Sequence, residues 1–410
     1  TEFVPLSHAN VQFISLFNDD MTQSSYLRRK QTMSKAAQAD RKMWSKIYTY
    51  DEWMEAQGIP IYHGYYIEDL RTLELGWWGA RDCKAAFIQL VGQEGVTSAR
   101  VTEIPPGKTL SPLKFSLDEI VYVVEGRGLT TIRAGKNRPR KTFEWQKHSM
   151  FLLPHNYTHQ FSNMQGDKPA RLLHYNYMPL TLSGVRDVNF IFGNPYEGLD
   201  IQNELDFYSE AKMVQQNLLD DSWGRRAYWY GNFFPDMRAW DKLDSNARRG
   251  AGGRSVYIQF PDSEMSCHMS VFDARLYKKA HRHGPGRVIV IPVGEGYSIM
   301  WEEGKDKVVV PWHEASCFVP PNRWFHQHFN AGGEPARYLA LHPPMQFHGH
   351  AEKVEDRAKD QIEYINEDKW VRDKFEAELA KRGITSLMPP EAYVDPDFEW
   401  NWSPFLHKSK

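Results

Sequence analysis

The 410-residue sequence has few cysteines, no excess of either charge and no long apolar run, and each shortage excludes a class of protein. Its three cysteines, Cys83, Cys267 and Cys317, are far apart and form no CxxC pair, which predicts reduced buried thiols and no disulfide framework. Fifty basic residues against 52 acidic ones leave a formal charge of −2, which gives no electrostatic case for nucleic acid or an anionic membrane as the main partner. The longest apolar runs, such as residues 288–293, fall far short of the roughly 20 residues of a membrane-spanning helix.

The first residues also lack the features of a targeting signal. Residues 1–6 contain no basic segment followed by an apolar one, so we expect no signal peptide and a cytoplasmic location. Hydrophobic residues make up 41% and charged residues 25% of the chain, which is ordinary globular usage and excludes a disordered or fibrous protein. Aromatic residues reach 14%, so the fold must offer a wide apolar interior, an interface or a pocket for a flat ligand.

The length predicts two domains with additional segments. Short strand-like runs broken by Gly and Pro occur in two blocks, with more helical, polar sequence before, between and after them. We therefore expect an N-terminal helical extension (1–80), a first β domain (81–185), a helical insert or linker (186–254), a second β domain (255–345) and a C-terminal helix with a tail (346–410).

The two β blocks are copies of one unit. Three pairs of segments match in the same order at offsets of 170, 168 and 167 residues, which chance similarity between strands does not readily produce. The matching pairs are 87–90 with 257–260, 119–126 with 287–294, and 151–163 with 318–330.

Polar motifs occur within both copies of this unit. The first copy contains Pro106, Gly107, Glu119, Gly126 and the segment PHNYTHQFSN at 154–163; the second contains HRH at 281–283, then His326 and Asn330. These motifs resemble the two signature blocks of the cupin superfamily, PG-x5-HxH-x3-E-x6-G and PxG-x2-H-x3-N. Over roughly residues 85–180 and 255–343, the chain is similar to a two-cupin protein, or bicupin.

The resemblance implies a mainly β fold. We expect two cupin barrels, each a double-stranded β-helix, packed together and accompanied by N-terminal helices, a helical insert and a C-terminal helix with a tail.

In the first copy, the resemblance implies that the metal site is incomplete. Leu113 and Phe115 occupy the positions of the two signature histidines. Glu119 and His159 are too few ligands to hold a divalent ion against water. We predict that this barrel is metal-free and structural; the alternative is that residues from elsewhere complete a site.

The second copy keeps its histidines. Side chains alternate along a strand, so His281 and His283 should point to the same face. His326 falls on the third ligand position, and three neutral imidazoles suit a first-row transition metal while leaving coordination positions open. We predict one divalent metal per chain, held by His281, His283 and His326. His328 has the same parity as His326 and could replace it as ligand; otherwise it is a catalytic acid or base or a substrate contact.

The sequence around these histidines (HRH at 281–283 and WFHQH at 324–328) also resembles a group of ring-cleaving cupin dioxygenases. Those enzymes act on gentisate, salicylate and hydroxynaphthoate and use iron(II) held by three histidines. That resemblance implies Fe(II), no organic cofactor, and oxidative cleavage of an aromatic or enolisable, carboxylated small molecule by dioxygen. A metal-dependent decarboxylase, isomerase or hydrolase, or a non-catalytic small-molecule-binding bicupin, remains an alternative. We expect a homo-oligomer, either a dimer or a tetramer.

Four further residues are candidates for the substrate site. Arg287 replaces the signature glutamate and could grip a substrate carboxylate through its planar fork, so it is both a catalytic and a substrate-binding candidate. The alternative for Arg287 is a structural ion pair with Glu302 or Glu303. Aromatic side chains close in sequence to the histidines would suit a flat substrate, although barrel cores are aromatic in any case; these candidates are Trp324, Trp301 and Tyr297.

Overall fold

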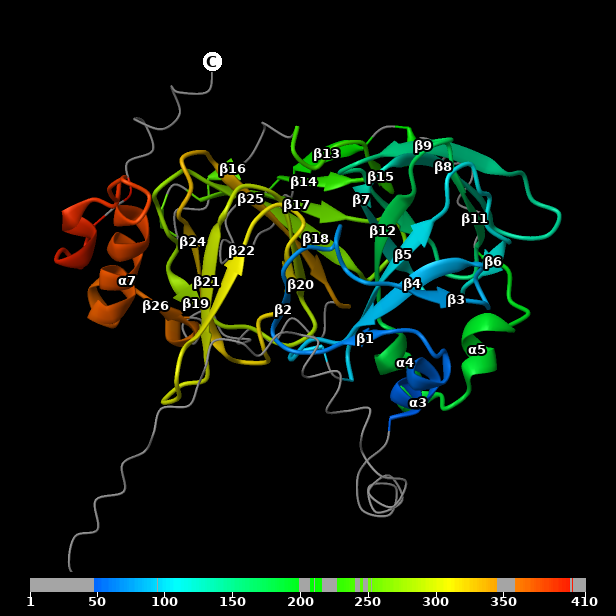
Figure 1. Ribbon diagram of the computed structural model, residues 1–410, viewed down its shortest axis with the longest axis horizontal. Helices are drawn as coiled ribbons and strands as arrows, with labels where there is room; N and C mark the ends of the chain where they lie inside the picture. The colour runs from blue at the N-terminus through cyan, green and yellow to red at the C-terminus, as the bar shows by residue number, and fades with distance from the viewer. Residues whose placement is uncertain are drawn as a thin grey trace, which may run out of the picture. The chain divides into compact units, whose positions relative to one another are not determined.

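The computed structural model of the chain (Figure 1) describes residues 48–93, 95–198, 207–209, 211–215, 227–239, 244–245, 250–251, 253–344, 358–398 and 400. The helices expected within residues 1–47, the first part of the expected C-terminal helix and the end of the tail lie outside these residues.

The first barrel is built from an eight-stranded and a four-stranded sheet. The larger sheet runs in the order β1-β4-β5-β12-β7-β10-β15, and β3 pairs with β4. The smaller sheet has the order β6-β11-β8-β9. The strands of the larger sheet are β1 (Ile61–Tyr62), β3 (Gly76–Trp78), β4 (Cys83–Ile88), β5 (Ser98–Ile104), β7 (Glu119–Glu125), β10 (Met150–Leu153), β12 (Ala170–Asn176) and β15 (Phe233–Phe234). Those of the smaller sheet are β6 (Leu113–Lys114), β8 (Arg127–Arg133), β9 (Lys141–Gln146) and β11 (Thr158–Asn163).

The second barrel repeats this plan with a nine-stranded and a five-stranded sheet. Its larger sheet runs β13-β14-β17-β18-β25-β20-β23-β2, with β16 paired to β17, and its smaller sheet runs β22-β21-β24-β19-β26. The larger sheet contains β2 (Tyr66–Ile67), β13 (Lys212–Gln215), β14 (Ala227–Tyr230), β16 (Asp244–Ser245), β17 (Arg254–Gln259), β18 (Ser266–Phe272), β20 (Val288–Val293), β23 (Cys317–Phe318) and β25 (Ala336–His342). The smaller contains β19 (Ala280–His281), β21 (Gly296–Trp301), β22 (Val308–Trp312), β24 (Phe325–Asn330) and β26 (Gln361–Ile362).

Strand order confirms the internal repeat. The series β5-β12-β7-β10 of the first barrel corresponds to β18-β25-β20-β23 of the second, and β6-β11-β8-β9 corresponds to β19-β24-β21-β22. In each barrel, one apolar cluster draws side chains from both sheets, so the two sheets pack face to face. In the first barrel, for example, Val121 and Phe151 of the larger sheet share a cluster with Phe161 and Trp145 of the smaller. The expected mainly β fold of two barrels with accompanying helices is therefore confirmed.

The expected segment boundaries need correction where strands pass between the barrels. Residues 61–78 are not a separate helical extension, because β1 and β3 extend the first barrel while β2 pairs with β23 of the second. Within the expected helical insert, β15 pairs with β10 of the first barrel, and β14 pairs with β17 of the second. These strands are too short to show a periodic pattern, and they form because the edge of a sheet presents unpaired backbone groups.

Helices cover one part of each barrel. Tyr50 and Met54 of α3 (Thr49–Ala56) pack with Leu182 of α4 (Met178–Gly184) and Ile191 of α5 (Val188–Phe192) in a cluster that includes Phe115 of the first barrel. Figure 1 shows these three helices together beside the first barrel. Three short 3-10 helices, η5 (Ala358–Asp360), η6 (Tyr364–Asn366) and η7 (Pro390–Tyr393), lie in the C-terminal segment.

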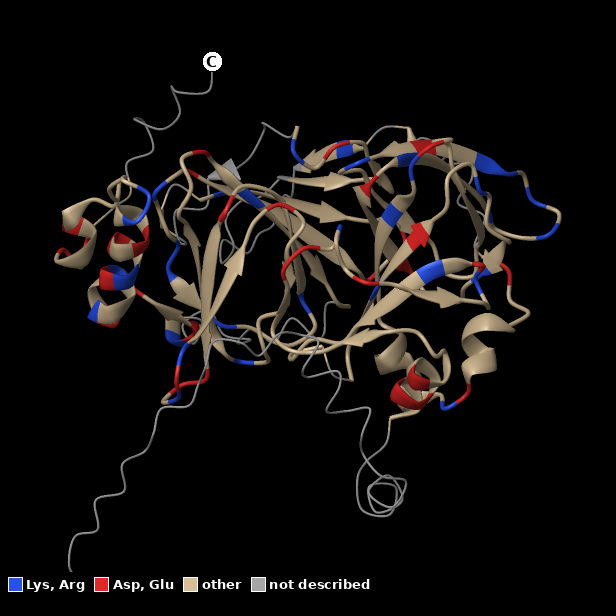
Figure 2. Ribbon diagram, in the orientation of Figure 1, with Lys and Arg blue, Asp and Glu red and all other residues tan. Residues whose placement is uncertain are grey.

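The C-terminal helix α7 (Lys369–Ala380) covers the smaller sheet of the second barrel (Figure 1). It begins at the cap Asp368, whose side chain accepts a hydrogen bond from the backbone N–H of Trp370. Its buried residues, Val371, Phe375 and Leu379, join the cluster that contains Tyr297 and Phe329 of the sheet. The opposite side of α7 carries both acidic and basic residues, as Figure 2 shows. No helix in the described part of the chain combines the length and apolar composition that a membrane span requires.

Candidate metal centre

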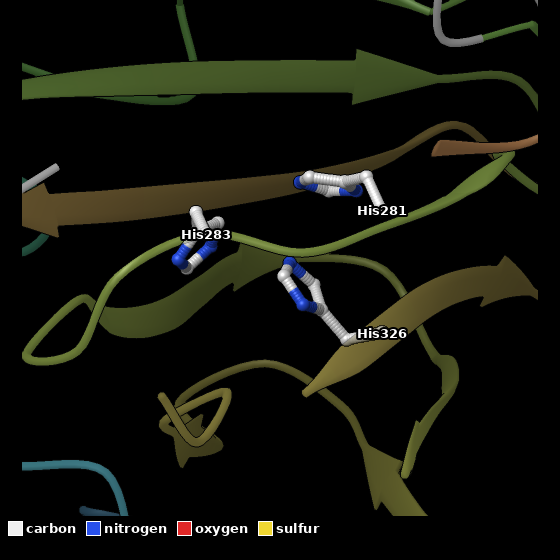
Figure 3. A group of neighbouring side chains, drawn as sticks. All are labelled: His281, His283 and His326. Carbon is white, nitrogen blue, oxygen red and sulfur yellow. The ribbon is translucent and has the colours of Figure 1, made fainter. Parts of the chain in front are cut away.

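The three histidines predicted as metal ligands meet inside the second barrel (Figure 3). His281 on β19 lies directly opposite His326 on β24 in an antiparallel pair. His283 follows His281 by two residues, beyond the end of β19, and its ring converges with those of His281 and His326. Their ring centroids lie 4.1 Å (His281 and His326), 4.6 Å (His283 and His326) and 5.6 Å (His281 and His283) apart.

The geometry of these rings fits a metal ion. One nitrogen of each ring lies within 4.8 Å of the others, and this is the only group of three or more such side chains among the described residues. Two nitrogens bound to one ion lie at most about 4 Å apart, since each bond is about 2 Å long. Small ring rotations therefore suffice to bring all three nitrogens onto one ion.

Hydrogen bonds orient two of the rings for binding. Nδ1 of His283 lies 2.8 Å from the carbonyl oxygen of Gly284, and Nδ1 of His326 lies 3.3 Å from that of Trp324. A carbonyl only accepts, so each Nδ1 carries the proton and each Nε2 keeps its lone pair for a metal. Both side chains are buried, at 3% and 1% exposed, whereas His281 is partly exposed. The site thus presents three converging imidazoles, and three protein ligands leave coordination positions open on a metal ion.

His328 lies deeper on the same strand and the same face. It is buried, and its ring centroid is 5.6 Å from that of His326 and 6.5 Å from that of His281. Nδ1 of His328 is 2.8 Å from the hydroxyl of Ser298, which also accepts a hydrogen bond from the indole N–H of Trp312. The convergent group contains His326 and not His328, so the geometry favours His326 as the ligand and leaves His328 held by Ser298 beside the site.

Arg287 lies immediately before β20 and is buried, at 5% exposed. One of the two carboxylates considered for a structural ion pair is engaged elsewhere, because Glu303 accepts from Nη1 of Arg282 at 2.9 Å. The Arg287 guanidinium is close enough to Tyr175 of the first barrel to favour the ionised phenol, although burial dominates and raises the pKa of Tyr175 well above its usual range. The guanidinium therefore lies within electrostatic range of Tyr175, a residue of the first barrel.

Two of the three aromatic candidates face away from the histidines, which corrects the sequence-based expectation. In the β21–β24 pair, Ser298 and Met300 lie opposite His328 and His326, so Tyr297 and Trp301 point to the other face of the sheet. Tyr297 stacks on Phe329 at 4.6 Å, and Trp301 on Phe325 at 5.6 Å, in the cluster covered by α7. Their rings belong to the docking surface of α7.

Trp324 remains a candidate for contact with the substrate. It lies two residues before His326, packs against the interior cluster of the second barrel and is partly exposed. Its ring centroid is 5.9 Å from that of Tyr65, which the N-terminal segment contributes. Tyr65 has no signal in the sequence, because only the pairing of β2 with β23 brings this segment to the second barrel.

The structure adds a buried lysine that sequence reasoning missed. Lys278 is 2% exposed, and its Nζ donates to the hydroxyls of Ser270 and Tyr338. The ring of Tyr338 lies 4.8 Å from that of His328, so Lys278 belongs to the same interior. On a regular strand, residue 278 would have the parity opposite to His281. The pairings of Tyr277 with Phe329 and of His281 with His326 differ by one residue, and this extra residue turns Lys278 inward.

The matching positions of the first barrel carry no such site. His159 pairs with Leu113 as His326 pairs with His281, which confirms the alignment of the two copies. Glu119 is engaged by protein groups: Arg100 lies 2.7 Å away, Nδ1 of His174 2.8 Å away, and the amide of Asn176 donates at 2.8 Å. The ion pair with Arg100 fills the position where a metal would need a free carboxylate.

Electrostatics in the first barrel follow from this ion pair. Burial opposes ionisation of Glu119, but Arg100 and His174 together hold its pKa well below the usual range. Burial lowers the pKa of His159 to about 3 and that of His174 to about 4, so both are neutral at pH 7. No group of three or more metal-type side chains converges in the described residues of this barrel.

Comparisons with known proteins give little beyond these observations. No protein-family model matches the sequence. No curated protein matches it either. Oxalate decarboxylase of Lactobacillus farciminis, in a formate complex, matches at 11% identity and a TM-score of 0.45, over 70% of this chain and 87% of that one. A mutant oxalate decarboxylase of Bacillus subtilis matches at 10% identity and 0.43, over 70% and 78% of the two chains. Hazelnut (Corylus avellana) vicilin matches at 11% and 0.41, over 68% and 85%. Likenesses of this size carry no argument about activity, so the assignments that follow rest on this chain's own residues.

We predict one divalent metal per chain, bound in the second barrel. After loading with Co(II) or Mn(II) and gel filtration, elemental analysis should find about one ion per wild-type chain. His281→Ala should lose it, because loss of a ligand should cost more than the roughly 10- to 100-fold in affinity that loss of a ligand's hydrogen-bond partner costs. His159→Ala, the same change at an interior position of the first barrel, is the control and should keep the ion. Two ions per wild-type chain, or loss from the control alone, would contradict the assignment.

The roles of His326 and His328 can be separated in the same way. His326→Ala should abolish metal binding, because it removes a convergent nitrogen. His328→Ala should keep the metal and reduce turnover by about 10²-fold or more if this residue transfers a proton. Metal content and kcat should be measured on both variants. Metal loss from His328→Ala with retention in His326→Ala would exchange the two assignments.

Proposed function

We propose that this protein is a metal-dependent enzyme whose second barrel acts on a small carboxylated molecule. The observation that carries the proposal is the convergence of His281, His283 and His326, with two of their Nδ1 atoms directed to backbone carbonyls. A purely structural metal site normally has four protein ligands, whereas three leave room for substrate.

The surrounding side chains support an anionic substrate. Three imidazoles are neutral ligands, so they leave the charge of a divalent ion uncompensated, and a carboxylate or phenolate oxygen would balance it. Lys278 and Arg287 add two buried cationic side chains at the same barrel. A bound metal would supply a Lewis acid that orients groups at its open positions. In this arrangement Arg287 binds and orients the substrate carboxylate, and His328, held by Ser298, accepts or donates a proton beside the ligands.

For the reaction class we propose oxidative cleavage by dioxygen, with Fe(II) as the ion. Support comes from the three-nitrogen ligand set without a carboxylate, which leaves positions for both a chelating substrate and dioxygen, and from the sequence resemblance to three-histidine dioxygenases. The alternative is decarboxylation, isomerisation or hydrolysis at the same ligands, in which the ion acts only as a Lewis acid. A non-catalytic binding protein is a third possibility that the same site would permit.

Simultaneous measurement of oxygen uptake and CO2 release distinguishes these reactions. Protein loaded separately with Fe(II) and Mn(II) is offered hydroxylated aromatic carboxylates and enolisable keto acids, in air and under argon, with His283→Ala as the metal-free control. The proposal expects oxygen uptake with Fe(II) in proportion to product, and none from the control. CO2 release that continues under argon would instead establish a decarboxylase. Saturable binding without turnover would establish a binding protein.

A second test concerns Arg287. Arg287→Lys keeps the charge but loses the planar two-point grip, so kcat/KM should fall about 10- to 100-fold without loss of metal. A substrate analogue without the carboxylate should lose about as much on the wild type and little more on the variant. Arg282→Lys is the matched control, because the Arg282 guanidinium forms ion pairs with Asp360 and Glu303. Unchanged kinetics in Arg287→Lys would assign this arginine a structural role.

A further inference from the structure

Residues 283–287, in the connection between β19 and β20, hold two groups that the proposed function needs. We call these five residues the metal loop; they contain the ligand His283 and end at Arg287. Only the two-residue strand β19 precedes the loop, so little regular structure fixes it from that side. Loops are generally more mobile than the elements they connect, and a metal site requires its ligands held closely in place. The contacts that hold this loop in place should therefore affect metal binding.

At Gly286, three hydrogen bonds join the metal loop to the first barrel. Its carbonyl oxygen accepts from the hydroxyl of Tyr175 at 2.8 Å and from that of Thr97 at 3.0 Å. Its N–H donates to the carbonyl oxygen of Gly92 at 2.7 Å. Tyr175 lies on β12, and Thr97 and Gly92 lie in the connection between β4 and β5, so every partner comes from the barrel that lacks the histidines.

The contact is also close in space. Gly286 has a φ of +84°, and a Cβ atom there would lie 2.9 Å from Cγ1 of Val96. On the other side of the same connection, a Cβ on Gly92 would lie 2.9 Å from Cα of Pro321, in the segment that leads to β24 and His326. The first barrel thus packs without a gap against both segments that carry ligands, and glycine is required at both points of approach.

The hydroxyl of Tyr175 is suited to a permanent donor role. The side chain is fully buried, and burial raises the pKa of Tyr175 well above its usual range, so the phenol keeps its proton at any ordinary pH. Within the metal loop, the ring of His283 bonds to the carbonyl oxygen of Gly284, and the backbone oxygen of His283 accepts from the N–H of Arg323. Displacement of Gly286 would therefore be passed on to the ligand through two residues.

We propose that Tyr175 and Thr97 of the first barrel are positioning residues for the metal centre of the second, acting through Gly286. The proposal rests on the proposed function only in that it requires a metal at His283. It gives the first barrel an indirect part in the chemistry of the second: no ligand set converges among the described residues of the first barrel, but its outer connections hold the loop that carries one.

Two conservative variants test this, with a matched control. Tyr175→Phe and Thr97→Val each remove one hydroxyl donor to Gly286. Tyr208→Phe removes a hydroxyl that donates to the carbonyl oxygen of Leu152 at 2.8 Å, within the first barrel, so it is the same chemical change away from the metal loop. Each protein is titrated with Co(II), and the dissociation constant, the visible absorption spectrum of the bound ion and the melting temperature are recorded.

We expect the loop variants to differ from the control in metal binding and not in stability. Tyr175→Phe and Thr97→Val should bind Co(II) about 2- to 10-fold more weakly than the wild type, as expected for one lost hydrogen bond, and with an altered spectrum. Tyr208→Phe should lower the melting temperature about as much as the two loop variants do. It should keep the wild-type affinity for Co(II) and the wild-type spectrum. Wild-type binding in both loop variants, or an equal shift in the control, would overturn the positioning role. A wild-type protein that binds no Co(II) would instead overturn the proposed function.

Discussion

The arrangement of the site depends on the alternation of side chains along paired β-strands. Because neighbouring residues of a strand face opposite sides of the sheet, the pairing of His281 with His326 determines the direction of every other side chain on β21 and β24. His328 and Ser298 fall on the interior face, and Tyr297 falls on the face that α7 covers. One register therefore separates the residues that can reach a metal from those that only dock a helix.

The two barrels show what the same scaffold can hold in its interior. In the first, Glu119 and Arg100 neutralise each other at 2.7 Å, and His174 completes the carboxylate's hydrogen bonds. A buried charge is tolerated when it is paired in this way. In the second, three imidazoles converge, and an imidazole in its neutral form can lie close to others without a counter-charge and offers a lone pair to a cation. The difference is one of residue type at matching positions, on strands of the same order.

The barrels also depend on each other structurally. The first barrel takes β15 from the connection between the barrels, whereas the second takes β2 from the segment that precedes the first. In addition, hydrogen bonds from the first barrel to Gly286 hold the metal loop from outside its own barrel. A metal centre with only three protein ligands gains from this arrangement, because its ligands are held by packing and need no fourth ligand to position them.

The sequence by itself determined the repeated β unit, the two-barrel fold, the incomplete ligand set at Leu113 and Phe115, and the three histidines of the second copy. These features depend on local pattern, such as period-two alternation and matched motifs, which a single chain displays without knowledge of its fold. Only the tertiary structure decided the features that depend on distant pairing. The short strands β2 and β15 take their partners from sheet edges, and Arg100 and His174 meet Glu119 across strands far apart in sequence. Lys278 turns inward because of a one-residue irregularity in pairing, which no alternation pattern contains. Tyr297 and Trp301, expected to contact the substrate, lie on the other face of the sheet for the complementary reason: closeness in sequence to the histidines does not determine direction until the register of β21 against β24 is known.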